Sequence, residues 1–135
     1  MSRSPLQSIA LLGGIALIAL GILGFIPGVT SHEGDISFAG HGSAAKFIGV
    51  FQVSVLLNLL HILIGLAGVA LARTAPGARQ YLLGGGVACL VLWALGIGRA
   101  GTWIPLSAAD DWLHLGIGVS LIGLAYATSS SLRTQ

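Results

Sequence analysis

Four long stretches of this sequence contain almost no side chain that is charged at neutral pH. The first runs from Arg3 to Glu33 without a single Lys, Arg, Asp or Glu. In the later three the only groups that charge near neutrality are His61 and His114. A helix of about 18–21 apolar residues crosses the roughly 30 Å hydrocarbon core of a bilayer. The pattern predicts an all-α membrane protein with four transmembrane helices, at about residues 7–26, 52–72, 80–98 and 110–129.

The composition agrees with a single transmembrane domain that covers residues 1–135. Only 7% of the residues are charged, against about 25% in ordinary soluble domains, and the mean hydropathy is +0.94. The six basic and four acidic residues form no basic stripe, which excludes nucleic-acid binding. The lone Cys89 cannot form an internal disulfide. The low charge and high hydropathy make the lipid bilayer the expected partner. The first apolar stretch is longer than the apolar segment of a cleaved signal peptide, so we expect the protein to retain it as a helix.

The basic residues predict the orientation in the membrane. Lys and Arg concentrate on the cytoplasmic side of membrane proteins, whereas acidic residues contribute little to orientation. Four of the six fall on the side of the chain ends and the short middle loop: Arg3, Arg73, Arg79 and Arg133. Lys46 and Arg99 fall on the other side. Both termini are therefore expected in the cytoplasm.

The four stretches form two similar pairs. The second contains Asn58, His61 and Gly65, and the fourth contains Asp111, His114 and Gly118 at the same spacing. The first and third match more loosely, with Leu11-Leu12-Gly13-Gly14 similar to Leu82-Leu83-Gly84-Gly85. The chain is therefore predicted to consist of two tandem helical hairpins, a direct repeat related by a pseudo-two-fold axis along the membrane normal.

Two long motifs resemble those of a bacterial family of four-helix membrane proteins, catalogued as domain of unknown function 4383. The first runs from Phe51-Gln52-Val53-Ser54 through Asn58 and His61 to Gly68, and the second from Trp103-Ile104-Pro105 to His114. The segment 38–46 also fits. The resemblance implies a multi-pass protein of the bacterial inner membrane and brings no activity with it. Many relatives carry a further His where this chain has Leu57, so a site that depends on that His would be absent here.

His61 and His114 form the candidate functional pair. Asn58, His61 and Gly65 fall on one helical stripe, and polar or small residues on a stripe face other helices because lipid would leave the imidazole unpaired. Each His is expected about 18–20 Å from the inner interface, given a rise of about 1.5 Å per residue. Two parallel helices that each present a His at one depth could enclose a bis-His site.

Three interpretations of this pair stay open. In the first, each His bonds a backbone carbonyl or a neighbour such as Asn58 and only holds helices together. In the second, the pair binds haem or a divalent metal ion. No Cys-x-x-Cys-His motif occurs, and no Lys or Arg lies in the predicted spans to meet haem propionates. In the third, the pair carries a proton or a small solute. We expect no cofactor.

Two acidic residues open the fourth predicted helix. Ser107 with Asp110 three residues later fits a capping box, and acidic side chains favour the first turn of a helix. Asp111 precedes His114 by three residues and could hydrogen-bond it, which would fix its tautomer. We expect Ser107 and Asp110 to cap the helix. For Asp111 the alternatives are capping and support of His114, as Asn58 would support His61.

The outer loop, residues 27–50, is long for a bundle of this size. It contains four side chains that could bind a divalent cation: His32, Glu33, Asp35 and His41. Their spacing matches no fixed ligand pattern, and the glycines between them favour a solvated, flexible loop. We expect such a loop here, and a metal site is the alternative.

The spans contain no Ser–His–Asp or paired-carboxylate arrangement that would support hydrolysis. We therefore expect a non-enzymatic integral membrane protein with a structural or accessory role, as a homo-oligomer or a subunit of a larger membrane complex. The alternative is a carrier of a cofactor, proton or small solute that works through His61 and His114.

Overall fold

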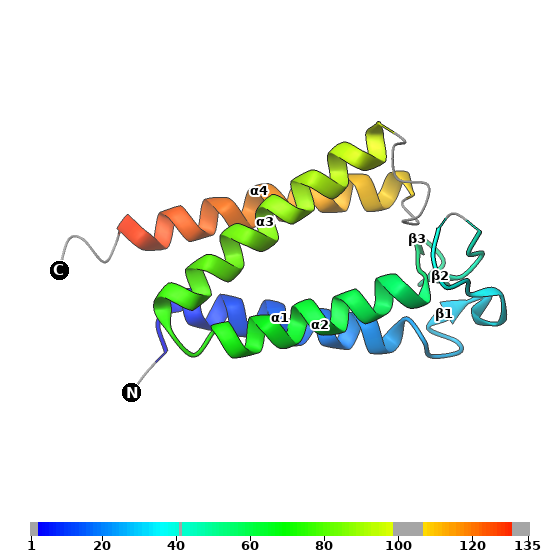
Figure 1. Ribbon diagram of the computed structural model, residues 1–135, viewed down its shortest axis with the longest axis horizontal. Helices are drawn as coiled ribbons and strands as arrows, with labels where there is room; N and C mark the ends of the chain where they lie inside the picture. The colour runs from blue at the N-terminus through cyan, green and yellow to red at the C-terminus, as the bar shows by residue number, and fades with distance from the viewer. Residues whose placement is uncertain (1–2, 41, 99–106, 131–135) are drawn as a thin grey trace.

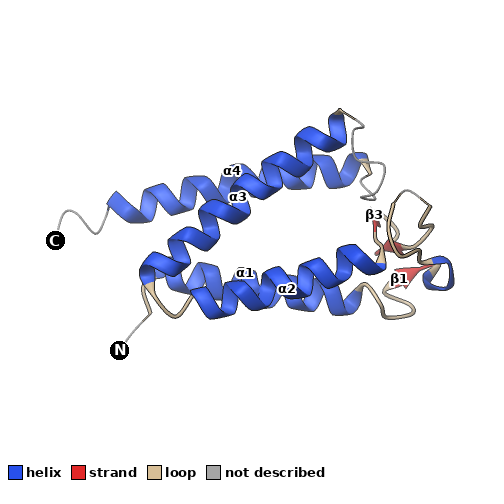
Figure 2. Cartoon of the chain, viewed as in Figure 1, coloured by secondary structure: helices blue, strands red, loops and turns tan. Residues whose placement is uncertain are grey.

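The structure, a computed structural model, describes residues 3–40, 42–98 and 107–130, and it is mostly helical (Figures 1 and 2). Its helices are α1 (Pro5–Leu23), α2 (Val55–Leu71), α3 (Ala75–Ile97) and α4 (Ala108–Ser130). Helix α1 packs along α2 and α3 packs along α4, which gives two antiparallel hairpins. The four helices and the tandem hairpins thus agree with the sequence-based prediction.

The helix ends differ from the predicted ones by up to five residues. Helix α1 ends at Leu23, not at residue 26, because Phe25 and Ile26 donate to carbonyls only three residues back. Helix α2 begins at Val55, not at 52, because the Ser54 side chain accepts from Leu57 N–H as an N-cap. Helix α3 begins at Ala75, not at 80, because Thr74 caps it. Local caps, and not the limits of apolar runs, set these ends.

The segment between α1 and α2 corrects the all-α prediction. It contains a three-stranded antiparallel sheet of β1 (Thr30–Ser31), β2 (Lys46–Phe47) and β3 (Phe51–Gln52), in that order, and a 3₁₀ turn η1 (Glu33–Asp35). Lys46 pairs with both Ser31 and Gln52. Ile48 and Gly49 both have positive φ in the three-residue connection, residues 48–50, that joins β2 to β3. The expected flexible loop is a small folded unit.

This unit is fixed to both helices of the first hairpin. The buried Thr30 hydroxyl donates to Leu23 O at the end of α1, at 3.2 Å. Val55 and Leu56 in the first turn of α2 donate their N–H groups to Ser37 O and Phe38 O. The first N–H groups of a helix have no partner within the helix, so the loop supplies them. The sheet therefore has a defined position at one end of the bundle.

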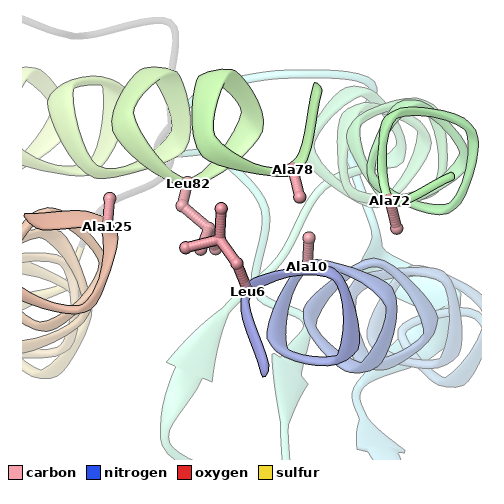
Figure 3. Packing of buried hydrophobic residues seen from close by; sticks show 6 residues of the cluster. All are labelled: Leu6, Ala10, Ala72, Ala78, Leu82 and Ala125. Atoms are coloured by element: carbon pink, nitrogen blue, oxygen red, sulfur yellow. The ribbon is translucent and has the colours of Figure 1, made fainter. Parts of the chain in front are cut away.

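We call that end of the helices the sheet end, and the opposite end, at the α2–α3 connection, the turn end. The turn end holds the N-terminus of α1 and the C-terminus of α4 (Figure 1). A cluster of buried apolar residues joins the two hairpins there (Figure 3). This turn-end cluster consists of Leu6, Ala10, Ala72, Ala78, Leu82 and Ala125. Four of the six are alanines, so the helices approach closely.

Within each hairpin the helices cross backbone to backbone at glycine. A Cβ atom on Gly14 would lie 2.7 Å from Gly65 O, and one on Gly65 would lie 2.5 Å from Gly14 O. In the second hairpin, a Cβ on either Gly86 or Gly118 would lie 3.0 Å from the carbonyl oxygen of the other. Small residues at such crossings allow the close packing that holds helices together in lipid.

Two of the helices are long and apolar enough to cross a membrane. Helix α1 has 19 residues and a hydropathy of 2.3, and α3 has 23 residues and a hydropathy of 1.7. Helix α2 is apolar but has only 17 residues. At a rise of 1.5 Å per residue, these three helices are about 28, 34 and 26 Å long.

Candidate functional site

The four side chains that the sequence singles out occupy equivalent places in the two hairpins. Asn58 and Asp111 are each the fourth residue of their helix, counted from Val55 and Ala108, and His61 and His114 are each the seventh. All four therefore lie on the half of α2 or α4 nearest the sheet end. The repeat is present in the local geometry as well as in the sequence.

Asn58 packs on the backbone at the end of α1. The side chain is 1% exposed, and its amide lies where a Cβ atom on Gly24 would stand. Gly24 is itself the C-cap of α1. A side chain at position 24 would therefore displace the Asn58 amide, so the missing Cβ is what admits a polar group at this helix contact.

Asp111 repeats this arrangement in the second hairpin. Its carboxylate lies where a Cβ atom on Gly96, in the last turn of α3, would stand. Gly24 and Gly96 are thus equivalent partners of Asn58 and Asp111. Close contact of an oxygen with a glycine Cα permits a weak C–H···O interaction, which adds modestly to the packing.

Five buried polar atoms have no hydrogen-bond partner in the part of the chain that the structure describes. They are Asn58 Oδ1 and Nδ2, His61 Nδ1, Asp111 Oδ1 and His114 Nδ1. All belong to the four residues of the candidate site. More than about 90% of buried polar groups in proteins are bonded, so a concentration of exceptions at one place requires an explanation.

Two expected hydrogen bonds are therefore missing. Because His61 Nδ1 and both amide atoms of Asn58 are unpartnered, the Asn58 amide does not bond His61. Asp111 Oδ1 and His114 Nδ1 likewise do not bond each other. Each polar residue at the fourth position leans toward the glycine of the facing helix, away from the His one turn later. Both side chains pack on these glycines, Gly24 and Gly96.

The two histidines are close enough for their charges to interact, although they belong to different hairpins. His114 also interacts electrostatically with Asp110, four residues earlier on the same helix. Among the described residues, no three His, Cys, Asp or Glu side chains converge as the ligands of a metal ion would. The pair therefore offers at most two nitrogen ligands from these residues.

Asp110 does more than close a helix end. Its carboxylate accepts from Ser107 N–H at 2.7 Å and from the Ser107 hydroxyl at 2.6 Å, while Asp110 N–H donates to Ser107 Oγ at 3.3 Å. This is the reciprocal pattern of a capping box. The same carboxylate approaches the backbone of Gln52 in β3, so the start of α4 lies near the sheet of the first hairpin.

The loop candidates are not brought together as a metal site in the described residues. His32 is exposed and has a φ of 55°, and its carbonyl accepts from Asp35 N–H at 3.0 Å in a tight turn. Glu33 lies between them in η1. His41 lies outside the described residues. The turn accounts for His32 and Asp35 without a ligand.

The contacts also correct the register of the looser repeat. Gly14 is equivalent to Gly86 and Gly24 to Gly96, so the first and third helices repeat every 72 residues. The match of Gly13-Gly14 with Gly84-Gly85 is therefore wrong by one residue. The partners of Gly65 and Gly118 agree with the corrected register, since they are Ile18 and Leu90. In that register, the pair Gly24 and Gly96 is visible in the sequence.

Comparison with known proteins gives one match. The family model described as Domain of unknown function (DUF4383) matches residues 7–127 of this chain. Neither a curated protein nor a solved structure matches it.

Proposed function

The chain belongs to the DUF4383 family, and from that premise we propose that it is a non-enzymatic protein whose four helices all cross the inner membrane of a bacterium. The outward-facing side chains support this proposal. Each helix carries a large apolar residue that is more than half exposed: Leu12 at 66%, Leu63 at 61%, Val87 at 55% and Val119 at 58%. A soluble monomer rarely exposes apolar surface on every element.

The turn end is proposed to face the cytoplasm. The exposed Arg3 and Arg73 lie at this end, and the positive-inside rule places such residues on the cytoplasmic side. Cysteine labelling tests it in a Cys89→Ala background, with Gly34→Cys and Pro76→Cys, because both positions are exposed. An impermeant maleimide added to intact cells should label residue 34 and spare residue 76. Preferential labelling of residue 76 would reverse the orientation.

The first functional proposal is a structural or accessory role, as a homo-oligomer or as a subunit of a larger membrane complex. The observation that carries it is the way both hairpins use their polar residues. Asn58 and Asp111 pack on Gly24 and Gly96 at the ends of glycine crossings, as residues that hold helices together do.

The second proposal is a carrier of a proton, a small solute or a cofactor. The unpartnered Nδ1 atoms of His61 and His114, which interact across the two hairpins, favour it. Ionisable groups inside membrane spans commonly mark such paths because their burial is costly. A packing role accounts for the buried side chains of Asn58 and Asp111. It does not account for the two buried imidazoles, whose Nδ1 atoms have no partner among the described residues.

Substitutions that keep or remove hydrogen bonding separate the two proposals. His61→Asn and His114→Gln retain polar groups, whereas His61→Leu and His114→Leu do not. If the histidines only hold helices together, the amide variants should melt with the wild type, and the leucine variants should lose about 1–2 kcal/mol. If they bind a ligand by imidazole, amide and leucine should be equally damaging, since neither restores that group.

The measurement is a detergent melting series on the wild type and these four variants. An absorption spectrum and a metal determination on the same samples detect haem or metal directly. Amide variants that melt with a metal-free, spectrally silent wild type would remove the cofactor form of the carrier proposal. Large and equal losses for both kinds of variant would remove the packing-only explanation of the histidines.

A further inference from the structure

The small folded unit between α1 and α2 exposes apolar side chains at its hairpin turn. Ile48 and Val50, in the three residues that join β2 to β3, are 59% and 49% exposed. Turn positions of a solvated loop are usually taken by Gly, Asn, Asp, Ser or Pro. We call residues 48–50 the apolar tip. Its two large side chains are not those that a turn in water selects.

The backbone of Ile48 makes this choice of side chain more unusual. Its φ is 46°, in the left-handed region, where a β-branched residue is a rare exception and Gly, Asn or Asp is preferred. An isoleucine at this position therefore destabilises the turn that contains it. Residues held in such conformations often have a role outside the local fold. The geometry thus points to a contact of the Ile48 side chain with something outside the chain.

Hydrogen bonds hold the apolar tip beside the end of α1. Ile48 N–H donates to Val29 O at 2.9 Å, and Val29 N–H donates to Ile26 O at 3.2 Å. Ile26 N–H in turn donates to the carbonyl of Leu23, the last residue of α1. Ile22 and Ile26 are themselves 49% and 39% exposed. Exposed apolar side chains therefore extend past the end of α1 toward the tip.

The helices of the first hairpin are short for a membrane. At about 28 and 26 Å, α1 and α2 are both shorter than the roughly 30 Å hydrocarbon core of a bilayer. The exposed Arg3 and Arg73 lie just outside their turn-end ends, where basic side chains stay at the lipid headgroups. If these helices cross the membrane as proposed, the missing length falls at the sheet end. Residues after Leu23 and before Val55 then meet the edge of the hydrocarbon core.

Exposed aromatic side chains support this placement of the membrane boundary. In residues 3–40, 42–98 and 107–130, four aromatic side chains are exposed, and all lie near helix ends. Phe25, Phe38 and Trp112 lie at the sheet end, and Tyr126 lies toward the turn end. Aromatic rings concentrate at the two interfaces of a membrane protein. Since Phe25 and Phe38 belong to the segment between α1 and α2, the base of the folded unit lies at the interface.

The part of the unit farthest from the helices has the opposite chemistry. There η1, at the far edge of the unit in Figure 2, contains Glu33 and Asp35, and acidic side chains favour water over lipid. Lys46 is exposed and precedes the tip by two residues. A lysine beside an inserted apolar group can extend its ammonium to the lipid phosphates. The unit is therefore amphipathic, with a charge that complements phosphate next to its apolar tip.

We propose that the unit between α1 and α2 is an interfacial anchor: the apolar tip is immersed in lipid at the sheet-end boundary of the membrane, with Lys46 at the lipid phosphates and η1 in water. The partner of the exposed tip is thus lipid and not a second protein. The proposal rests on the membrane-spanning arrangement proposed above. Immersion in lipid favours isoleucine at position 48 despite its disfavoured φ, because the side chain leaves water.

Spin labels test the anchor in the full-length protein in nanodiscs, in a Cys89→Ala background. Single cysteines carry the label at three exposed positions: Val50→Cys in the tip, Leu63→Cys on α2 and Gly34→Cys in η1. Oxygen concentrates in lipid and a nickel chelate stays in water, so their relative effects on the label measure its depth. The label at residue 50 should lie about 5–10 Å below the headgroup surface. Residue 63 should lie deeper, and residue 34 should lie in water.

Ile48→Asn, with the label kept at residue 50, separates anchoring from folding. Asparagine is polar but tolerates a positive φ, so this variant should melt in detergent at a temperature at least as high as the wild type does. In nanodiscs the label should nevertheless move outward by about 5 Å, because the tip loses its apolar side chain. Ile48→Leu is the matched control. It keeps an apolar side chain, so the depth of the label should not change.

A label at residue 50 as open to the nickel chelate as residue 34 would overturn the anchor. So would an unchanged depth in Ile48→Asn. A label shielded from both oxygen and nickel would also overturn it, since it would indicate contact with protein, such as a second copy of this chain. In each case a lipid-exposed label at residue 63 would leave the membrane-spanning proposal standing. Free access of nickel to residue 63 would remove both proposals.

Discussion

The two hairpins pack their helices against each other in the same way but differ in one chemical group. In both, glycines cross backbone to backbone, and a polar side chain one helical turn from a histidine packs on a glycine of the facing helix. The first hairpin uses the amide of Asn58, and the second uses the carboxylate of Asp111. The shared geometry places a planar polar group of the same size at both positions, as an amide in one hairpin and as a carboxyl group in the other.

A further difference lies at the two ends. The first hairpin carries the sheet, and its turn end is closed by Gln7, which donates to Ala72 O and Arg73 O at 3.1 and 2.9 Å. The second hairpin has Arg79 in the equivalent place, with its guanidinium 5.6 Å from the centre of the Tyr126 ring. Each hairpin thus joins its two helices at the turn end by different chemistry.

The largest expected effect is at the glycine crossings. Gly65→Val and Gly118→Val would press side-chain atoms into the facing backbone, and each should cost about 3 kcal/mol of unfolding free energy, the upper end for overpacking. Gly13→Val and Gly116→Val are the controls, since a Cβ at either position meets nothing within 4 Å. Detergent melting measures all four. A control as damaging as its crossing variant would contradict the close contact.

Exchange of the two polar groups tests their equivalence. Asn58→Asp should cost about 2 kcal/mol, because it brings a carboxylate into a site that is 1% exposed. Asp111→Asn should change stability by less than about 0.5 kcal/mol, because an amide of the same shape already fits the equivalent place in the first hairpin. Chemical denaturation of both variants provides the comparison. Equal losses would show that the two places differ in shape as well as charge.

The glycines that receive these groups should tolerate even a methyl poorly. Gly24→Ala and Gly96→Ala are each expected to cost about 1–2 kcal/mol, since the amide or carboxylate must move. Gly84→Ala and Gly123→Ala lie on α3 and α4 where a Cβ meets nothing within 4 Å, so they serve as controls. Melting temperatures that do not separate the two pairs would remove Gly24 and Gly96 from the site.

The smallest effect is expected at the turn end. Gln7→Ala should cost about 1 kcal/mol, the usual net worth of buried or half-buried hydrogen bonds. Arg79→Ala should cost about 0.5–1 kcal/mol through its contact with the Tyr126 ring. Gln80→Ala, at an exposed neighbouring position, should be neutral. A Gln7→Ala variant as stable as the wild type would show that the two Gln7 hydrogen bonds do not stabilise the first hairpin.

The repeat of Asn58-x-x-His61 and Asp111-x-x-His114 was readable from the sequence, because spacing along one helix fixes which residues share a face. Charge-free runs located the four helices, although their limits missed the observed helix ends by up to five residues. Both inferences depend on residues that are near each other in the chain. For such residues, helical geometry alone determines their relative position.

Only the tertiary structure shows which residues of other segments contact these side chains. The fit of Asn58 on Gly24, the fit of Asp111 on Gly96 and the pairing of Lys46 with Ser31 and Gln52 join segments that no local rule relates. The register of the first and third helices was misjudged by one residue because Leu and Gly recur there at several offsets. Only a contact across the hairpin selects one offset, because a Cβ atom on Gly86 would lie 3.0 Å from Gly118 O, whereas one on Gly85 would meet only the Leu121 side chain at 3.6 Å. The sequence by itself therefore determined the helices and the stripe on each, and the packing of one helix on another determined the partners.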